Sequence, residues 1–322
     1  MKVLASVGRE DVAIVYMADI GEKLYVEFVE AVQPPLPREK KWVLLVSTLL
    51  GCPVKCLMCD AGGYYKRKLS KGEIFSQIDF LIKKRFPTGK VPVEKFKIQF
   101  ARIGEPSLNL NVLEVLEELP HRYNVPGLIP CISTIAPAGT DRFFEGLLEI
   151  KKKKYPEGRF QLQFSIHTTD EKLRDKLIPV KKWDFAKISE YGEKFYERGG
   201  RKITLNFALS EGMPVEPEIL LQFFDPEKYL IKITPINPTY KAMENRLFSY
   251  IDPYHEEKDY QLVKNLRSFG YEVIVSIGEV EENYIGSNCG QYVMRHLKAK
   301  RHIKNSYAYN VSKFGPTGQE CL

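Results

Sequence analysis

The sequence predicts an α/β fold: a partial, six-stranded version of the parallel α/β barrel with a short β-hairpin before it. Three observations predict this fold. Strand-like runs alternate with helix-like runs along most of the chain, which is typical of a parallel sheet built from βαβ units. Six such units follow one another, fewer than the eight of a closed barrel. Ahead of them, two strand-like runs are joined by a turn and not by a helix.

The hairpin is expected between residues 12 and 32, where VAIVYMAD and LYVEFVEAV flank the turn-prone IGEK. QPPLPREKK follows, and its prolines and charges predict a surface loop. The barrel strands are expected at 43–48, 96–101, 128–133, 160–167, 203–209 and 229–234. The helices between them are expected at 73–84, 112–119, 141–151, 185–197 and 217–224. A last helix at 257–268 and a strand at 272–276 lead into a tail rich in Gly, Asn and Lys.

This order suggests three parts: a hairpin and linker over 1–40, the partial barrel over 41–293 and a basic tail over 294–322. A chain of 322 residues that is 44% hydrophobic can fill a substantial core. The longest apolar run, 42–50, is far shorter than the roughly 18–20 residues that cross a bilayer. Charges at 9–11 interrupt the amino terminus before a signal-type segment can form, so we expect a cytoplasmic protein. The net charge of +7 tolerates an anionic partner without demanding one.

Three of the six cysteines, Cys52, Cys56 and Cys59, form a C-x3-C-x2-C motif in the loop after the first barrel strand. Every iron of a four-iron cluster needs a terminal ligand, so three cysteines would leave one iron open. The alternatives are a zinc site completed by a distant fourth ligand, or three unrelated cysteines. Zinc sites usually show a second pair of closely spaced ligands, and the sequence has none. The motif therefore favours an open [4Fe–4S] cluster.

Polar residues recur where the predicted strands end, which is where an α/β barrel builds its site. Taken singly, each has a plain structural interpretation: GEP is a turn, Asn before Pro is a loop residue, and a strand-end His is often a hydrogen-bonded core residue. Their repeated position at strand ends favours a ligand site. The residues are Gly104, Glu105, Ser133, Ser165, His167 and Asn237.

The chain carries the segments VEAV, STLLGCPVKCLMC, RKLSKGEI, GEPSLNLNV, STIAP, SIHTTDEKLRDKLIPV, KITPINP and SNCGQYV, between about residues 29 and 293. In this order they resemble the RlmN/Cfr family of radical S-adenosylmethionine (SAM) methyl synthases, which methylate C2 or C8 of adenosine in RNA. SIHTTDEKLRDKLIPV and the final CGQ are more specific than the cysteine motif, which the whole radical SAM superfamily shares.

The resemblance implies a role for each matching position. The three clustered cysteines would ligate a [4Fe–4S] cluster, and the six strand-end residues would contact SAM. Cys289 would be the S-methylated cysteine, and Glu30 of VEAV would accept a proton. An electron donor such as a flavodoxin or a ferredoxin would reduce the cluster.

The implied chemistry explains these residue types. An sp2 carbon of adenine is too weakly nucleophilic for ordinary methyl transfer, so the family first methylates the cysteine with one SAM. A 5′-deoxyadenosyl radical from a second SAM then takes a hydrogen from that methyl group, and the carbon radical adds to the ring. A carboxylate is suited to remove the ring proton afterwards. A free cysteine is more often a small buried hydrophobe, but the polar, glycine-flanked SNCGQ favours a reactive thiol at Cys289.

Three departures from the family concern the end of the reaction and the substrate. Leu45 stands where the family has the cysteine that resolves the enzyme–substrate adduct, and Cys131 or Cys321 is a hypothetical substitute. The segment before VEAV is also shorter than the helical domain of the family. IGEVEENYIGSNC is acidic where the family is basic, and acidic groups repel RNA phosphates, although the basic stretch 295–304 offsets this in part.

Three functions therefore stand as alternatives. One is an RlmN/Cfr-like methyl synthase that acts on RNA adenosine or on another sp2 carbon. A second is a radical SAM enzyme of the same lineage that acts on a small molecule, lipid or peptide, with Cys289 in a different role. The third is a nucleic-acid-binding module with a structural metal, which the open cysteine triad disfavours. The sequence favours methyl synthase chemistry and leaves the substrate open.

Overall fold

The computed structural model describes residues 1–255, 258 and 260–314 of the chain. Within them, one large sheet has the strand order β12-β11-β10-β9-β8-β7-β4-β3-β2-β1-β13. A separate ribbon pairs β5 (Leu49–Gly51) with β6 (Tyr65–Lys68). The strands of the large sheet are β1 (Lys2–Arg9), β2 (Ala13–Asp19), β3 (Tyr25–Ala31), β4 (Lys41–Val46), β7 (Lys95–Phe100), β8 (Leu128–Thr134), β9 (Gln161–Ser165), β10 (Ile203–Leu209), β11 (Tyr229–Pro235), β12 (Glu272–Val275) and β13 (Ser312–Lys313).

The strands from β4 to β12 in this order all run parallel to their neighbours, which confirms the α/β class with a mainly parallel sheet. The amino-terminal strands β1, β2 and β3 are antiparallel, and β3 pairs antiparallel with β4. The expected hairpin at 12–32 is thus β2 and β3, and it continues the large sheet. The strand β1 was not expected from the sequence, although its residues pair with β2 over almost their whole length.

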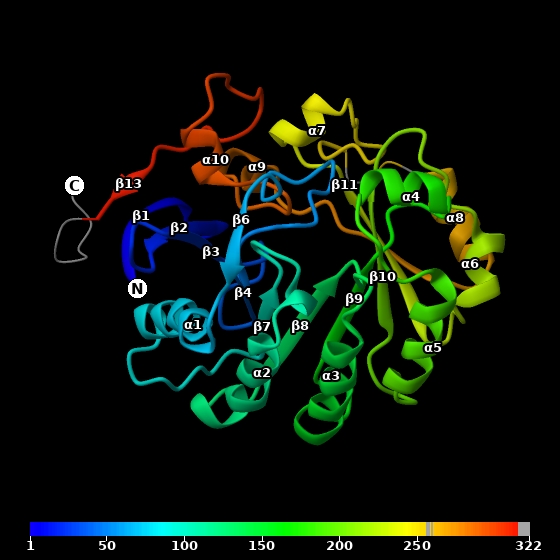
Figure 1. Ribbon diagram of the computed structural model, residues 1–322, viewed down its shortest axis with the longest axis horizontal. Helices are drawn as coiled ribbons and strands as arrows, with labels where there is room; N and C mark the ends of the chain where they lie inside the picture. The colour runs from blue at the N-terminus through cyan, green and yellow to red at the C-terminus, as the bar shows by residue number, and fades with distance from the viewer. Residues whose placement is uncertain (256–257, 259, 315–322) are drawn as a thin grey trace.

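The helices are α1 (Lys71–Arg85), α2 (Asn111–Arg122), α3 (Asp141–Lys154), α4 (Glu171–Leu177), α5 (Phe185–Phe195), α6 (Pro217–Phe223), α7 (Tyr240–Glu244), α8 (Gln261–Ser268), α9 (Val280–Ile285) and α10 (Val293–Leu297), with a 3-10 turn η1 (Pro106–Leu108). Figure 1 shows α1, α2, α3 and α5 along one side of the sheet, and α7, α9 and α10 near the carboxyl ends of the parallel strands. We call the helix-covered face of the sheet the outer face and the opposite face the inner face.

The outer face forms the main core. Side chains alternate along each strand, so every second residue faces the helices. In β7 these residues are Phe96, Ile98 and Phe100, which are fully buried against the apolar sides of the helices. Helix α1 begins with a capping box in which Ser70 and Glu73 each accept a bond from the other's backbone N–H, and this box fixes where the helix starts.

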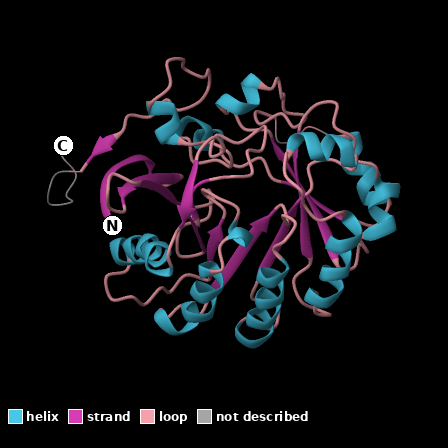
Figure 2. Cartoon of the chain, in the orientation of Figure 1, coloured by secondary structure: helices cyan, strands magenta, loops and turns pink. Residues whose placement is uncertain are grey.

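The inner face is covered differently along the sheet. Over β1 to β3 it carries a second apolar cluster, which Ile285, Val293, Ile303 and Tyr307 close from the carboxyl-terminal segment. Over β4, β7 and β11 the inner positions stay partly accessible, while their outer neighbours are buried. The layers of helix and strand are seen in Figure 2. The parallel part of the sheet therefore has one packed face and one face that water reaches.

The predicted elements agree with the structure to within a few residues, but the structure also contains several short elements besides β1 that were not expected. Helix α8 is Gln261–Ser268, shorter than the expected 257–268, and residues 257 and 259 lie outside the described residues. Helix α4 was not expected, because its seven residues, EKLRDKL, are mostly charged. In the described part of the chain, no helix is both long enough and apolar enough to cross a bilayer.

Candidate active site

The three clustered cysteines lie on one loop that begins at β5, beyond the carboxyl end of β4. The loop is fastened by its own backbone and by its neighbours. The amide of Cys52 donates to the carbonyls of Ala61 and Tyr64 at 3.1 and 3.0 Å. The amide of Leu57 donates to the carbonyl of Leu177 at 2.9 Å, which ties the loop to α4. These hydrogen bonds hold the loop in a defined shape.

Asp60 is a further anchor of this loop that sequence reasoning missed. Its buried carboxylate accepts hydrogen bonds from the amides of Tyr240 and Lys241 at 3.1 and 2.9 Å. These amides open α7, so the carboxylate also suits the positive end of that short helix. The aspartate directly after the last cysteine, in CLMCD, was the only signal for it in the sequence.

The environment of the three thiols fits a positively charged iron–sulfur group. Burial raises the pKa of Cys52, of Cys56 and of Cys59, and the neighbouring thiols raise the last two further. Three thiolates crowded in this way need cationic ligation, and soft thiolates suit iron–sulfur clusters. In the described residues, no group of three or more His, Cys, Asp and Glu is gathered tightly enough for a single metal ion. The chemistry of three soft thiolates therefore fits an iron–sulfur cluster.

Cys289 lies next to the cysteine loop, although more than 200 residues separate them in the sequence. The amide of Asp60 donates to the carbonyl of Gly290 at 2.9 Å. The thiol of Cys289 is close enough to Cys56 and Cys59 to raise the pKa of both. Its own pKa is raised by burial and lowered by Lys232 and Arg102, while its side chain remains exposed to solvent. Water therefore reaches Cys289.

In the CGQ motif, the structure explains why a glycine and a glutamine follow Cys289. Gly290 has φ +82°, and a Cβ there would lie 3.0 Å from the carbonyl oxygen of Met58. The Gln291 amide group donates to Asn283 O, Pro238 O and Ser306 Oγ, and its oxygen accepts from Asn288 N–H at 3.2 Å. Glycine permits the close approach, and glutamine holds the loop that carries Cys289.

We expect Gly290→Ala to destabilise the protein by about 1–3 kcal/mol, because it adds a left-handed backbone penalty to a tight contact with the cysteine loop. Displacement of Cys289 by even a fraction of an ångström should also slow its methylation. Gly199→Ala is the matched control, since Gly199 has φ +75° and open space around its Cβ position. Thermal unfolding and peptide mass spectrometry measure both effects. Equal losses in the two variants would show that the contact with Met58 contributes nothing.

Two of the expected SAM-binding residues lie in the GEP turn. Gly104 has φ +100°, and a Cβ there would collide with Leu49 at 2.5 Å. The buried carboxylate of Glu105 accepts bonds from Ser107, from Thr134 Oγ1 and from the amide of Ile135 at 2.9 Å. Burial raises the pKa of Glu105, and these donors lower it. Glu105 therefore joins the ends of β7 and β8 with its side chain, which leaves the turn's backbone to meet a ligand.

The remaining strand-end residues face the inner side of the sheet. Ser133 Oγ accepts a bond from Gln163 at 3.0 Å, and Ser165 is half-buried at the end of β9. His167 is buried with φ +67°, and its Nδ1 accepts the amide of Ala208 at 3.0 Å. Burial lowers the pKa of His167 to about 3, so the ring is neutral and its Nε2–H remains available to a ligand. Asn237 donates to the carbonyl of Cys289 at 3.0 Å, so it positions the loop of the reactive cysteine.

Glu30 is not brought to this site. It lies on the outer face, where its carboxylate accepts bonds from Tyr16, Trp42 and Arg85 beneath α1. The proton-accepting role expected for Glu30 stays a prediction. The position of its carboxylate on the outer face does not favour that role. The carboxylate of β3 on the inner face is Glu27, three residues earlier. Residues an odd number apart on a strand face opposite sides, so only one of the two can reach the site.

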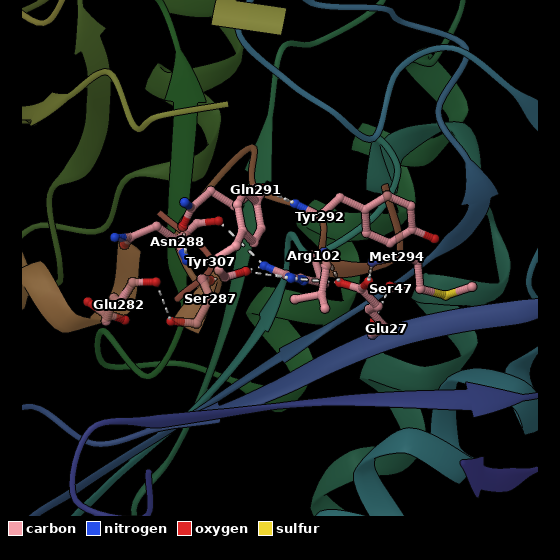
Figure 3. Close-up of polar contacts among 12 residues, drawn as sticks. Glu27, Ser47, Arg102, Glu282, Ser287, Asn288, Gln291, Tyr292, Met294 and Tyr307 are labelled. Atoms are coloured by element: carbon pink, nitrogen blue, oxygen red, sulfur yellow. Dashed lines mark hydrogen bonds and ion pairs between the residues drawn. The ribbon is translucent and has the colours of Figure 1, made fainter. Parts of the chain in front are cut away.

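Glu27 forms a fully buried ion pair with Arg102, which Figure 3 shows beside the loop of Cys289. Arg102 Nη2 donates to Glu27 Oε2 at 2.7 Å and to the carbonyl of Gly286 at 2.9 Å. Its Nη1 donates to the carbonyl of Ser287 at 3.0 Å. Glu27 also accepts the amide of Met294 at 2.6 Å. The pair therefore connects β3, the end of β7 and both sides of the loop that carries Cys289.

Of the two cysteines that could replace the missing resolving cysteine, one lies among the residues that the structure describes. Cys131 is buried on the inner face of β8, where its sulfur accepts a bond from Gln163 at 3.2 Å. Lys232 lies near both Cys131 and Cys289, since it lowers the pKa of each. Leu45 is also on the inner face, at the edge of the second apolar cluster. Cys321 lies outside the described residues, so its part in the hypothesis cannot be tied to a contact.

Comparison with known proteins finds relatives that are named as RlmN methyltransferases. No family model matches the chain. A protein of Petrotoga mobilis named "Probable dual-specificity RNA methyltransferase RlmN" is 25% identical over 298 residues, 91% of this chain and 78% of the relative. A protein of the same name from Chlorobium phaeobacteroides is 28% identical over 278 residues, 84% and 72% of the two chains.

The fold has a counterpart among solved structures. A radical SAM methyltransferase from Sphaerobacter thermophilus superposes with a TM-score of 0.66. The match covers 90% of this chain and 81% of that one at 19% identity. At this identity the likeness supports the fold, and the chemistry of the site must come from the residues described above.

Proposed function

The chain is a relative of the RlmN-like radical SAM methyltransferases and an enzyme, and on this premise we propose that it cleaves SAM reductively and methylates an sp2 carbon through Cys289. The observation that carries the proposal is the position of Cys289 beside the cysteine loop, held there through Gly290 and Asp60. A methyl-carrying thiol must lie within reach of the place where SAM is opened, and this contact provides that proximity.

Cys52, Cys56 and Cys59 would hold a [4Fe–4S] cluster, which would supply one electron to SAM at its open iron. The backbone of the turn at Gly104 would approach SAM, and the hydroxyls of Ser133 and Ser165 lie on the inner face. His167 would donate from Nε2, because its Nδ1 already accepts the amide of Ala208. These residues bind and orient SAM in the proposal.

Cys289 would act first as a nucleophile and then as a carrier of the methyl group. The thiolate is the reactive form, and burial opposes its formation. Lys232 and Arg102 act in the opposite direction, since both lower the pKa of the thiol. The carbonyl of Cys289 is fixed by Asn237, so the sulfur is presented at a constant place. Glu30 receives no part in this proposal, because its carboxylate is bound on the outer face.

Anaerobic reconstitution tests the proposal. The purified chain, supplied with iron, sulfide, SAM and dithionite, should hold about four irons and release 5′-deoxyadenosine. Mass spectrometry should find a methyl group on the peptide that contains Cys289. Release of 5′-deoxyadenosine with an unmodified Cys289 would instead favour the second function, a radical SAM enzyme that uses this cysteine differently. Failure to cleave SAM at all would contradict both.

A separate experiment tests how the covalent enzyme–substrate adduct is resolved. If Cys131 replaces the missing resolving cysteine, Cys131→Ala should methylate Cys289 normally and then accumulate a covalent enzyme–substrate adduct. Intact-protein mass spectrometry after one turnover detects the adduct. Normal multiple turnover in Cys131→Ala would exclude Cys131 and leave the reaction to end without a resolving thiol on the described part of the chain.

A further inference from the structure

The inner face of the parallel strands has an unusual distribution of charge. In β4 and β7 to β11, the positions that face inward carry four lysines and no carboxylate. The lysines are Lys41, Lys95, Lys97 and Lys232. Between them stand uncharged polar groups, among them Gln161, Gln163 and Asn206. These inward positions therefore carry positive charge that no carboxylate on the same strand positions balances.

These lysines are reached by water. The inward residues of β4, β7 and β11 are partly exposed at every second position, while their outer neighbours are buried. Lys97 and Lys232 lie three residues before the ends of β7 and β11, so both stand about 10 Å below the edge that carries the cysteine loop. Lys97 and Lys232 thus lie partly exposed on the inner face below this edge, and we call this part of the inner face the recess.

Lys232 connects this recess with the reactive cysteine. Its ammonium group forms no hydrogen bond or ion pair with any described residue. It lies close enough to Cys289 and Cys131 to lower the pKa of both thiols. Lys97 donates to Gln161 Oε1 and also lowers the pKa of Cys131. Both ammonium groups therefore act on Cys131, and Lys232 also acts on Cys289.

The charged groups around Lys232 do not neutralise it. Burial lowers the pKa of Lys232, and among carboxylates Glu282 of α9 raises it, but burial also raises the pKa of Glu282 to about 7, so that carboxylate is only partly ionised near neutrality. Arg102 is occupied by Glu27 and by backbone carbonyls. Ammonium groups that share a recess without counter-charges are stabilised when an anion binds between them.

We propose that Lys97 and Lys232 form a recessed binding site for an oxyanion group, a phosphate or a carboxylate, on a small-molecule substrate. The site deepens the proposed function and rests on it, because Cys289 makes this recess a place of reaction. The depth of the site favours a small molecule. A phosphate within a nucleic-acid chain would have to bring its flanking nucleotides about 10 Å below the strand ends.

Lysine acylation tests the site without reference to turnover. Burial lowers the pKa of Lys97 to about 8, and Lys41, Lys95 and Lys232 act in the same direction while Cys131 opposes them. Lys97 in the reconstituted holoenzyme should therefore react readily with limiting N-hydroxysuccinimidyl acetate at pH 8. Inorganic phosphate or succinate at ten times its dissociation constant should slow acetylation of Lys97 and Lys232 about tenfold. Exposed Lys152 on α3 provides the internal control, whose acetylation should not change.

Variants separate the site from a general effect of salt. Lys232→Met should abolish protection of Lys97, and Lys97→Met should abolish protection of Lys232, so that failure of one variant to fold leaves the other. Lys152→Met should preserve protection. Protection by phosphate alone or by succinate alone supports the site and identifies the oxyanion.

Absence of protection by both anions would overturn the proposal while leaving SAM cleavage, measured on the same sample, as the test of the proposed function. Protection by an adenosine-containing oligoribonucleotide, but by neither small anion, would also overturn it.

Discussion

Replacing Cys289 by alanine is expected to reduce methyl transfer by at least about 10³-fold while leaving the iron–sulfur cluster in place. The thiol has no substitute within the loop, since Asn288 and Gly290 offer no nucleophile. Its side chain forms no hydrogen bond that supports the cysteine loop, which is held instead through Gly290 and Asp60. The loss should therefore be chemical and not structural.

Two kinds of measurement test this prediction. Iron content and the visible absorption of the cluster show whether the cluster is retained, and product mass shows whether the methyl group is transferred. Cys131→Ala is the control for the cluster and for methylation of Cys289, the steps that come before any resolving thiol acts, because it removes a buried thiol of β8 and leaves the methyl carrier in place. It should retain both the cluster and methylation of Cys289. Methyl transfer at the normal rate in Cys289→Ala would show that the methyl group passes directly from SAM to the substrate.

Much of the fold was predictable because its strands alternate cleanly between two faces. KFKIQF and YLIKITP each place apolar residues on the outer face at every second position, and their predicted bounds differ from the observed strands by one residue at most. The same alternation already places Lys97 and Lys232 on the inner face, although the sequence alone does not show that two strands bring them to one recess. The positions of strands and helices can be predicted from the local sequence pattern. Which residues share one site depends on the order of the strands in the sheet, which the local pattern does not give.

The site was predictable where residues act through a motif and not where they act through distant contacts. The cluster cysteines and Cys289 stand in recognisable segments, and the structure brings all four together. Glu27 and Arg102 are 75 residues apart, and no spacing relates them. The choice between Glu27 and Glu30 also needed the structure, because β3 is buried on both faces and its alternation gives no preference. The sequence VEFVEAV contains two glutamates, and only one of them can face the inner side of the sheet.

Removal of Arg102 is expected to have the largest effect on stability of any substitution considered. Its side chain and that of Glu27 are 2% and 0% exposed, so Arg102→Met would leave a buried carboxylate without its counter-charge. Breaking a buried pair from one side costs about 3–5 kcal/mol. Burial already raises the pKa of Glu27 against the effect of Arg102, so the variant would bury a proton or an unpaired charge. For a chain of this length the melting temperature should fall by on the order of 5 °C.

Arg122→Met supplies the control for this experiment. Arg122 pairs with Asp79 at 2.8 Å, close to the 2.7 Å of the buried pair, but both of its side chains are partly exposed, so its loss should cost about 1 kcal/mol or less. Thermal and denaturant unfolding compare the two variants. A loss in Arg102→Met no greater than in Arg122→Met would mean that the buried pair contributes little beyond a surface contact.

The double variant Glu27→Leu with Arg102→Met distinguishes stability from positioning. Removing both charges together avoids the unpaired carboxylate, so the double variant should recover much of the stability that Arg102→Met loses. The carbonyls of Gly286 and Ser287 would still lack the donors that Arg102 provides. Methylation of Cys289 should therefore stay slow in a chain that is folded and holds its cluster. Recovery of both stability and methylation would show that the pair supports the fold alone, and that the loop of Cys289 is placed sufficiently by Gly290, Gln291 and Asn237.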